Sequence, residues 1–214
     1  MSRIVYVNGS YLPEEQARIS VFDRGFLFAD GVYEVSSVLR GKLIDNRGHL
    51  ARLHRSLGEL DMAAPAGDAD IEAIQQALIE KNALDEGLVY LQVTRGAADR
   101  DFAYPEGVKG SLVMFTQQKD VVDSPQAASG ISVIAVDDMR WRRRDIKTVG
   151  LLAPCMAKMQ ARAAGADDAW LVEDGYVTEG SSSNAFIVDP DGSLITRQLG
   201  NEILAGITRK AVLQ

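Results

Sequence analysis

Lys147 is the first residue whose position suggests chemistry, because it lies in the run Asp145-Ile146-Lys147-Thr148, just before an apolar stretch with helical spacing. A lysine held rigidly and partly removed from water loses the stabilisation of its charged form, and its free amine is then a nucleophile. Position alone favours an ordinary solvated lysine. A catalytic role therefore depends on the other segments.

Glu179 is followed by a glycine, three serines and Asn184, and then by the apolar residues of a predicted strand. Such a run suits a cofactor with an aromatic ring. The carboxylate can pair with a protonated pyridine nitrogen, while hydroxyl and backbone groups fix the ring edge and a phosphate. Glycine and serine are also common in ordinary turns, so the run alone is not decisive.

Two further segments could bind a phosphate. The run from Leu204 to Arg209 places Gly206 and Thr208 at a predicted helix start, where backbone N–H groups attract anions. Arg52 lies on a predicted helix, and its guanidinium matches phosphate oxygens in pairs. The alternatives are a routine threonine cap and a solvated arginine on a helix face.

The elements that carry these residues follow from hydrophobic spacing. Asn8-Gly9 and Arg40-Gly41 predict two hairpin turns, and four leucines at helical spacing predict a helix. The polar stretch Gln117–Gly130 is the predicted domain boundary. The helical leucines are Leu50, Leu53, Leu57 and Leu60, and a second helix is expected over Asp70–Leu84. The expected strands are Gly31–Leu39, Leu88–Thr94, Ser111–Thr116, Ile131–Val136, Ala169–Glu173, Tyr176–Thr178, Ala185–Val188 and Ser193–Thr196, and a further helix is expected over Leu151–Ala164.

Composition restricts the class of protein. The chain has 214 residues, a net charge of −7 and 46% hydrophobic residues, which is typical of a globular protein and unfavourable for nucleic-acid binding. The lone Cys155 rules out an internal disulfide and is expected to be buried, and no cluster has metal spacing. The beginning of the chain does not resemble a signal peptide, so a cytoplasmic location is expected.

Taken together, the segments around Lys147, Thr178–Asn184 and Leu204–Arg209 resemble, in this order, the fold-type IV pyridoxal-phosphate enzymes. Asp30–Val35 and His49–Arg52 resemble the D-amino-acid aminotransferase branch. This resemblance implies an α/β fold of the D-amino-acid aminotransferase type. It also implies a small α+β domain over residues 1–120 and a cofactor-binding domain over 121–214. Family members usually continue for several tens of residues, so the natural chain is expected to extend beyond Gln214.

The resemblance implies a role for each residue. Lys147 would carry pyridoxal 5′-phosphate as a Schiff base and move a proton between substrate and cofactor. Glu179 would keep the pyridine nitrogen protonated, and Arg52 would bind the phosphate. The other expected neighbours of the ring and phosphate are Ser182, Ser183, Asn184, Gly206, Ile207 and Thr208.

Substrate recognition is implied for Tyr33, Arg100 and Phe102. In the D-amino-acid branch, a tyrosine and an Arg-x-His pair from the partner subunit hold the substrate α-carboxylate. Tyr33 and Arg100 match this pattern, but Phe102 stands in place of the histidine. The expected activity is amino transfer between a D-amino acid, such as D-alanine, and a 2-oxo acid in a homodimer with its site at the subunit interface.

Four alternatives stay open at this point. Three share the fold: a branched-chain L-amino-acid aminotransferase, an aminodeoxychorismate lyase and an (R)-amine transaminase. Asp30–Val35 and Arg100 favour the D-amino-acid branch over the first two, while Phe102 keeps the amine transaminase open. The fourth alternative is a non-catalytic cofactor-binding protein. Retention of both Lys147 and Glu179 argues against it, because binding alone needs no electron sink.

Overall fold

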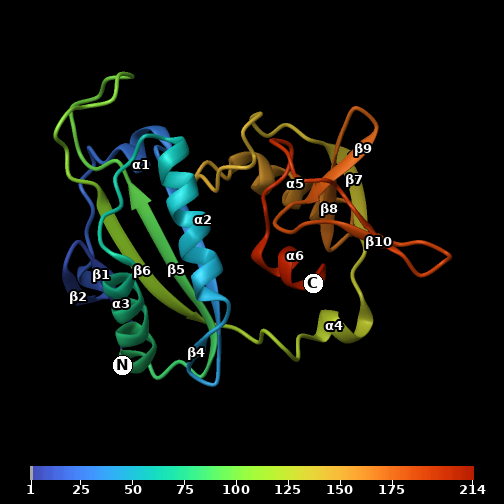
Figure 1. Ribbon diagram of the computed structural model, residues 1–214, viewed down its shortest axis with the longest axis horizontal. Coiled ribbons are helices and arrows are strands. Elements are labelled where there is room, and N and C mark those ends of the chain that lie inside the picture. Colours follow the sequence, from blue (N-terminus) through green and yellow to red (C-terminus); the bar gives the residue numbers. More distant parts are fainter. Residues whose placement is uncertain (1) are drawn as a thin grey trace. The chain divides into compact units, whose positions relative to one another are not determined.

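The computed structural model describes residues 2–214, which divide into two compact units (Figure 1). The first unit contains the chain up to Ser124 together with Lys147–Val149. The second contains Pro125–Ile146 and Gly150–Gln214. The short segment with Lys147 therefore belongs to the first unit, although the residues on both sides of it belong to the second.

The first unit is built on a six-stranded sheet in the order β2-β1-β6-β5-β3-β4, and neighbouring strands are antiparallel. The strands are β1 (Ile4–Val7), β2 (Ser10–Pro13), β3 (Gly31–Leu39), β4 (Lys42–Leu43), β5 (Glu86–Thr94) and β6 (Ser111–Gln118). The predicted turn at Asn8-Gly9 is confirmed, with φ values of 48° and 102°. Both values are positive, as a two-residue hairpin turn of this hand requires.

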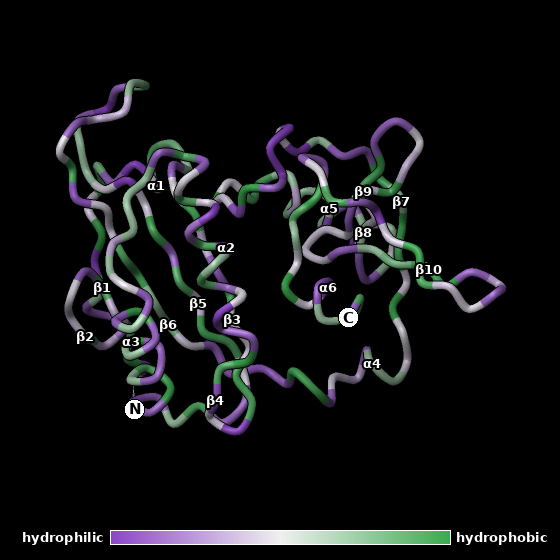
Figure 2. Tube along the Cα trace, viewed as in Figure 1, coloured by the Kyte–Doolittle hydropathy of each residue, from purple (hydrophilic) through white to green (hydrophobic). Residues whose placement is uncertain are grey.

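Helices α2 (Asn46–Glu59) and α3 (Asp68–Lys81) lie on one face of this sheet (Figure 1). Figure 2 shows hydrophobic and hydrophilic residues alternating along α2, and the buried positions include Leu50, Leu53 and Leu57. The predicted leucine stripe is thus confirmed for these three residues. Leu60 follows the last helical residue and is half-buried. Two short helical segments complete this unit, η1 (Glu14–Gln16) and α1 (Arg24–Phe28).

The second predicted helix ends earlier than expected. Helix α3 stops at Lys81, and Ala83 has a positive φ of 48°, a left-handed conformation that cannot continue a right-handed helix. Leu84 leaves the helix and packs instead with Val38, Ile79 and Val89 in a core cluster. Leu84, which the predicted helix included because it is apolar, is therefore a core residue that lies outside the helix.

The second unit has a three-stranded sheet in the order β7-β8-β9, with β7 parallel and β9 antiparallel to the central strand. Its elements are α4 (Pro125–Ser129), β7 (Val133–Asp137), α5 (Leu152–Ala163), β8 (Asp168–Glu173), β9 (Tyr176–Gly180), β10 (Phe186–Val188), β11 (Leu194–Thr196) and α6 (Ile207–Val212). Strands β10 and β11 form a separate hairpin.

Helix α5 covers the sheet of the second unit through small residues. Ala157 and Ala161 are buried and pack with Ala169 and Leu171 of β8. The prediction that Cys155 is buried is wrong, since it is exposed, and the alanines supply the buried face of the helix. The polar stretch Gln117–Gly130, predicted as the domain boundary, includes the division between the two units at Ser124 and Pro125. It contains the last residues of β6 and helix α4, whose first residue, Pro125, suits the start of a helix.

The packing of α2 gives a test of the core of the first unit. Leu53 is 1% exposed. Replacing it with alanine leaves a cavity, so Leu53→Ala is expected to lower the free energy of unfolding by about 2–5 kcal/mol in urea titrations. Arg55→Ala on the exposed side of the same helix is the control. A loss for Leu53→Ala no larger than for this control would contradict the packing.

Candidate functional site

The main chain of Lys147 is fixed by pairing with the edge of β3. The backbone N–H of Tyr33 donates to the carbonyl of Lys147 at 3.0 Å, and the N–H of Val149 donates to the carbonyl of Gly31 at 3.0 Å. The N–H of Lys147 also donates to Ser56 Oγ at 3.3 Å, on helix α2. The lysine therefore starts from a rigid support rather than from a loose loop.

The side chain of Lys147 lies against an aromatic stack. Its Nζ is 4.2 Å from the centroid of the Tyr33 ring. Tyr33 stacks on Tyr90 at 5.6 Å between centroids, and Tyr90 stacks on Phe115 at 4.7 Å. Burial, together with the neighbouring Tyr33, raises the pKa of Tyr90 to about 12. The structure thus brings together two residues that the sequence analysis assigned to catalysis and to substrate binding.

Arg52 is a buried arginine that is held by Glu34. Its Nε donates to Glu34 Oε1 at 2.8 Å and its Nη2 donates to Oε2 at 2.7 Å. His49 Nδ1 lies 2.8 Å from Oε2 of the same carboxylate. Burial alone would raise the pKa of Glu34, but the hydrogen bonds from Arg52 and His49 outweigh it and hold this pKa below its ordinary value. The alternative of a solvated Arg52 is therefore wrong, since only 8% of the residue is exposed.

Glu34 is not among the predicted site residues, although the sequence carries a signal for its pairing with Arg52. The buried residues of β3 alternate along the strand, and Glu34 falls on the same face as Val32 and Val38. A glutamate on the buried face of a strand needs a cation or several donors nearby. The helix that follows in sequence supplies Arg52.

Arg100 and Phe102 lie together on the connection between β5 and β6. The Cζ of Arg100 is 5.4 Å from the ring centroid of Phe28 and 5.5 Å from that of Phe102. The rings of Phe28 and Phe102 are 5.6 Å apart. Phe102 is 79% exposed. The residues assigned to the substrate therefore form two groups in this unit, Tyr33 with Lys147 and Arg100 with Phe102.

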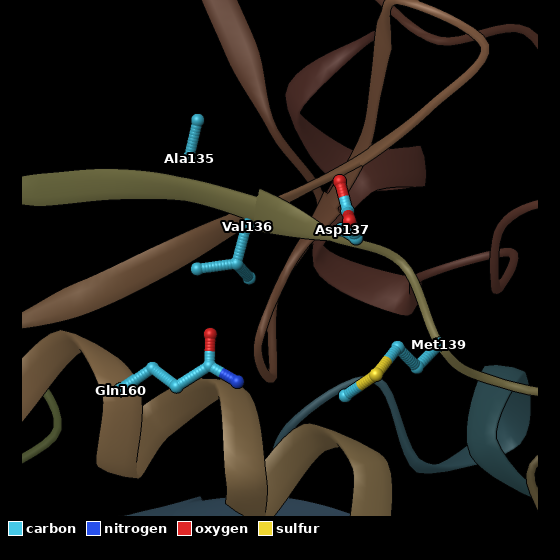
Figure 3. Close-up of a pocket in the computed structure, with 5 residues that line it drawn as sticks. All are labelled: Ala135, Val136, Asp137, Met139 and Gln160. Atoms are coloured by element: carbon cyan, nitrogen blue, oxygen red, sulfur yellow. The ribbon is translucent and has the colours of Figure 1, made fainter.

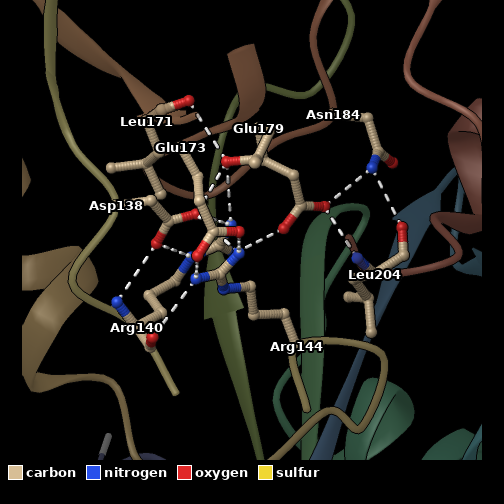
Figure 4. Close-up of polar contacts among 9 residues, drawn as sticks. Asp138, Arg140, Arg144, Leu171, Glu173, Glu179, Asn184 and Leu204 are labelled. Atoms are coloured by element: carbon tan, nitrogen blue, oxygen red, sulfur yellow. Dashed lines mark hydrogen bonds and ion pairs between the residues drawn. The ribbon is translucent and has the colours of Figure 1, made fainter. Parts of the chain in front are cut away.

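In the second unit, Glu179 is a buried carboxylate near the end of β9, with partners from three segments (Figure 4). Its Oε1 accepts hydrogen bonds from Asn184 Nδ2 at 2.8 Å and from the backbone N–H of Leu204 at 2.9 Å. Its Oε2 is in contact with Nη1 of Arg140. Burial raises the pKa of Glu179 above its ordinary value, against the opposing effect of Arg140.

Arg140, the third partner of Glu179, is not among the predicted site residues. Its Nη2 donates to Asp138 Oδ2 at 2.8 Å, and Thr178 Oγ1 donates to the same oxygen at 2.6 Å. Burial alone would raise the pKa of Asp138, but the hydrogen bonds from Arg140 and Thr178 hold it below its ordinary value. Arg140 thus links an aspartate with a fully buried side chain to Glu179. The signal in the sequence was a concentration of arginines just before Lys147 in an acidic chain.

The segment 180–184 folds back on itself, and its last residue, Asn184, contacts the segment before α6. The N–H of Gly180 donates to the carbonyl of Ser183 at 2.7 Å, which closes a tight turn that also contains Ser182. Asn184 Nδ2 donates to the carbonyl of Leu204 at 2.9 Å. A Cβ on Gly206 would lie 2.0 Å from Asn184 Oδ1, so only glycine permits this approach. Ile207 and Thr208 follow at the start of α6.

A separate depression in the second unit, of about 320 Å³, is lined by Ala135, Val136, Asp137, Met139 and Gln160 (Figure 3). These residues come from β7, the segment after it and α5, and none is a predicted site residue.

Across residues 2–214, no group of three or more His, Cys, Asp or Glu side chains is arranged to hold a metal ion. The helices of the same residues are all too short or too polar to cross a membrane.

Comparisons with known proteins agree on one family. Residues 31–214 match the family model described as amino-transferase class IV. A D-alanine aminotransferase of Bacillus licheniformis is 37% identical over 210 residues, which cover 98% of this chain and 74% of that protein.

Two solved structures are similar in fold. A branched-chain amino acid aminotransferase of Escherichia coli has a TM-score of 0.91 at 21% identity, covering 100% of this chain and 73% of that one. A branched-chain amino acid aminotransferase of T.th., complexed with N-(5′-phosphopyridoxyl)-L-glutamate, has a TM-score of 0.88 at 24% identity, covering 100% and 72%. At these identities, the likeness establishes the fold.

The lowered pKa of Glu34 predicts a pH dependence. The ionised carboxylate stabilises the folded chain above the ordinary pKa of a glutamate, and this contribution is lost as the pH falls through the folded-state pKa. Glu34→Gln leaves Arg52 buried without its counter-ion, so the free energy of unfolding should fall by about 3–5 kcal/mol at neutral pH.

The difference between the wild type and Glu34→Gln should shrink in acid, where both side chains are neutral, and urea unfolding at a series of pH values measures it. Glu59→Gln is the control, because Glu59 is in an exposed pair with Arg55 at 3.8 Å. A difference that is constant with pH would exclude the assigned role of the Glu34 charge.

Proposed function

Because this chain belongs to the class IV aminotransferase family, we propose that it transfers an amino group between a D-amino acid, such as D-alanine, and a 2-oxo acid. The observation that carries this proposal is the similarity to a D-alanine aminotransferase over nearly the whole chain, which includes Tyr33, Arg100 and Lys147. Similarity to the branched-chain enzymes is weaker in sequence and supports only the fold.

Pyridoxal 5′-phosphate is the proposed cofactor, and the donor set fits it. When bound, it supplies an electron sink and carries the amino group between the two substrates. Glu179 offers a buried carboxylate suited to a protonated ring nitrogen. The lack of a Cβ on Gly206 lets Asn184, which binds the Glu179 carboxylate, approach the main chain before α6. The complex of a similar protein with a phosphopyridoxyl compound is consistent with this choice.

Lys147 is proposed to hold the cofactor covalently and then to move the proton at the substrate Cα as general base and acid. Its main chain is fixed by the pairing with β3, so its Nζ can return to the same position in each half of the reaction. The ring of Tyr33 lies beside this Nζ and limits the directions from which a substrate can approach.

Glu179 is proposed to hold the proton of the ring nitrogen. Asn184 and the N–H of Leu204 fix one carboxylate oxygen, and Arg140 contacts the other. The proposed phosphate ligands are Arg52, oriented by Glu34, and the backbone around Ile207. The remaining proposed neighbours of the ring and phosphate are Ser182, Ser183, Gly206 and Thr208.

The substrate α-carboxylate is proposed to meet Tyr33 and, from a second copy of the chain, Arg100. Phe102 would then form an apolar wall where a histidine would donate a hydrogen bond. Its exposed apolar ring favours an (R)-amine as a second candidate donor, because an amine has no carboxylate that needs this bond. A homodimer in the cytoplasm, with its sites at the subunit interface, completes the proposal.

The first test is the absorbance of the purified protein with pyridoxal phosphate. The wild type should show a visible band from the lysine-bound cofactor, and D-alanine but not L-leucine should remove it. Lys147→Ala should lack the band, because no other amine is proposed to carry the cofactor. Lys158→Ala, on an exposed part of α5, is the control.

Two results would count against the proposal. Conversion by L-leucine alone would assign the protein to the branched-chain enzymes. A band that persists unchanged in Lys147→Ala would exclude Lys147 as the carrier.

The second test restores the missing donor. Phe102→His should lower the KM for D-alanine about tenfold, because a hydrogen bond to a charged group adds about 1.5 kcal/mol or more. The same change should not improve an (R)-amine substrate. Phe26→His, at another exposed phenylalanine, is the control. An equal gain for both substrates in steady-state assays would contradict a carboxylate contact at this position.

A further inference from the structure

Arg24 is a buried arginine that binds the main chain of the connection carrying Arg100 and Phe102. It is 3% exposed and is the first residue of α1. Its Nη1 donates to the carbonyl of Asp101 at 2.6 Å and to that of Ala103 at 3.3 Å. These two carbonyls belong to the residues on either side of Phe102. One guanidinium nitrogen therefore holds the backbone before and after this side chain.

The direction of Arg24 is itself fixed by a buried ion pair. Its Nε donates to Asp30 Oδ2 at 2.7 Å, and its Cζ lies 4.6 Å from the ring centroid of Phe28. Asp30 Oδ2 also accepts from Arg95 Nε at 2.8 Å. Two arginines thus share one carboxylate, and Arg24 directs its Nη1 to the loop carbonyls.

A second contact secures the far side of the loop. The Cζ of Arg95 is 3.6 Å from the ring centroid of Tyr104, two residues after Phe102. Since Phe102 is 79% exposed, packing in the interior cannot fix its position. Its place, and that of Arg100 beside it, depends on the anchored main chain and on the contact of both with Phe28.

We propose that Arg24 is a positioning residue for substrate recognition, which holds the backbone on both sides of Phe102 and so sets where Arg100 and Phe102 meet the substrate α-carboxylate. This inference rests on the proposed function, because it assumes a substrate that carries a carboxylate. Arg24 itself touches neither substrate nor cofactor in this proposal, since it is buried beneath the loop. Lysine cannot replace it, because a single ammonium lacks the planar fork that reaches Asp30 and both carbonyls.

The test compares Arg24→Lys with the wild type in the reaction with D-alanine. The KM for D-alanine should rise about ten- to hundredfold, because a small displacement of a binding group is costly, while kcat changes less than about threefold. The visible band of the lysine-bound cofactor should be unchanged. Arg18→Lys is the matched control, because Arg18 also donates to two backbone carbonyls but is exposed.

A second readout does not depend on activity. Hydrogen exchange of the backbone amides in residues 97–110 should be faster in Arg24→Lys than in the wild type, and unchanged in Arg18→Lys. Asp30→Asn covers the case in which Arg24→Lys folds poorly. It removes the charge that orients Arg24, whose Nε donates to Asp30 Oδ2 at 2.7 Å, and keeps a side chain of the same shape. This variant should raise the KM in the same direction, but by less.

The outcomes separate the role of Arg24 from the proposed function. A wild-type protein that does not convert D-alanine overturns the proposed function, and the carboxylate role of Arg24 with it. A wild type that converts D-alanine while Arg24→Lys leaves the KM unchanged, or lowers kcat as strongly as it raises the KM, overturns the role of Arg24 alone. If Arg24→Lys fails to fold, an unchanged KM in Asp30→Asn overturns it.

Discussion

Buried carboxylates matched by arginines are the constraint on which the rest of this structure depends. An ionised carboxylate in the interior is strongly unfavourable unless a cation and further donors meet it, and removing one partner of such a pair costs about 3–5 kcal/mol. Glu34 meets Arg52 and Glu179 meets Arg140. Each pair joins segments that are distant in sequence, so the charges that prepare the proposed chemistry also hold the elements in register.

The same pairs explain why these acids differ in their readiness to take up a proton. Glu34 has two strong donors and a lowered pKa, so it serves as a fixed anion for Arg52. Glu179 also contacts an arginine, yet its burial dominates and its pKa is raised. A carboxylate of the second kind gains most from a new positively charged partner, as a protonated ring nitrogen would be. Environment, rather than residue type, distinguishes the two roles.

Local patterns in the sequence predicted the elements well. The leucine spacing of α2 and the Asn8-Gly9 turn follow from interactions within a few residues, and both are confirmed. The partners of the buried acids could not be predicted in this way. Arg24 meets the loop beyond Asp101, and Arg140 meets Glu179, across separations that periodicity does not encode. Which arginine pairs with which partner depends on how strands and loops come together in space. A single sequence shows the charged residues that could pair, but not which of them do.

The pairing of Lys147–Val149 with β3 has a consequence for how the molecule can be divided. The chain leaves the first unit after Ser124, returns to it for these three residues, and leaves again. A single cut between Ser124 and Pro125 would therefore not yield two self-sufficient modules. One fragment would have an open strand edge at Gly31–Tyr33, and the other would carry the unpaired segment that belongs there. Lys147 is flanked in sequence by residues of the second unit, but it packs as part of the first. Exchanging one unit between proteins would therefore separate Lys147 either from its neighbours in sequence or from its partners in β3.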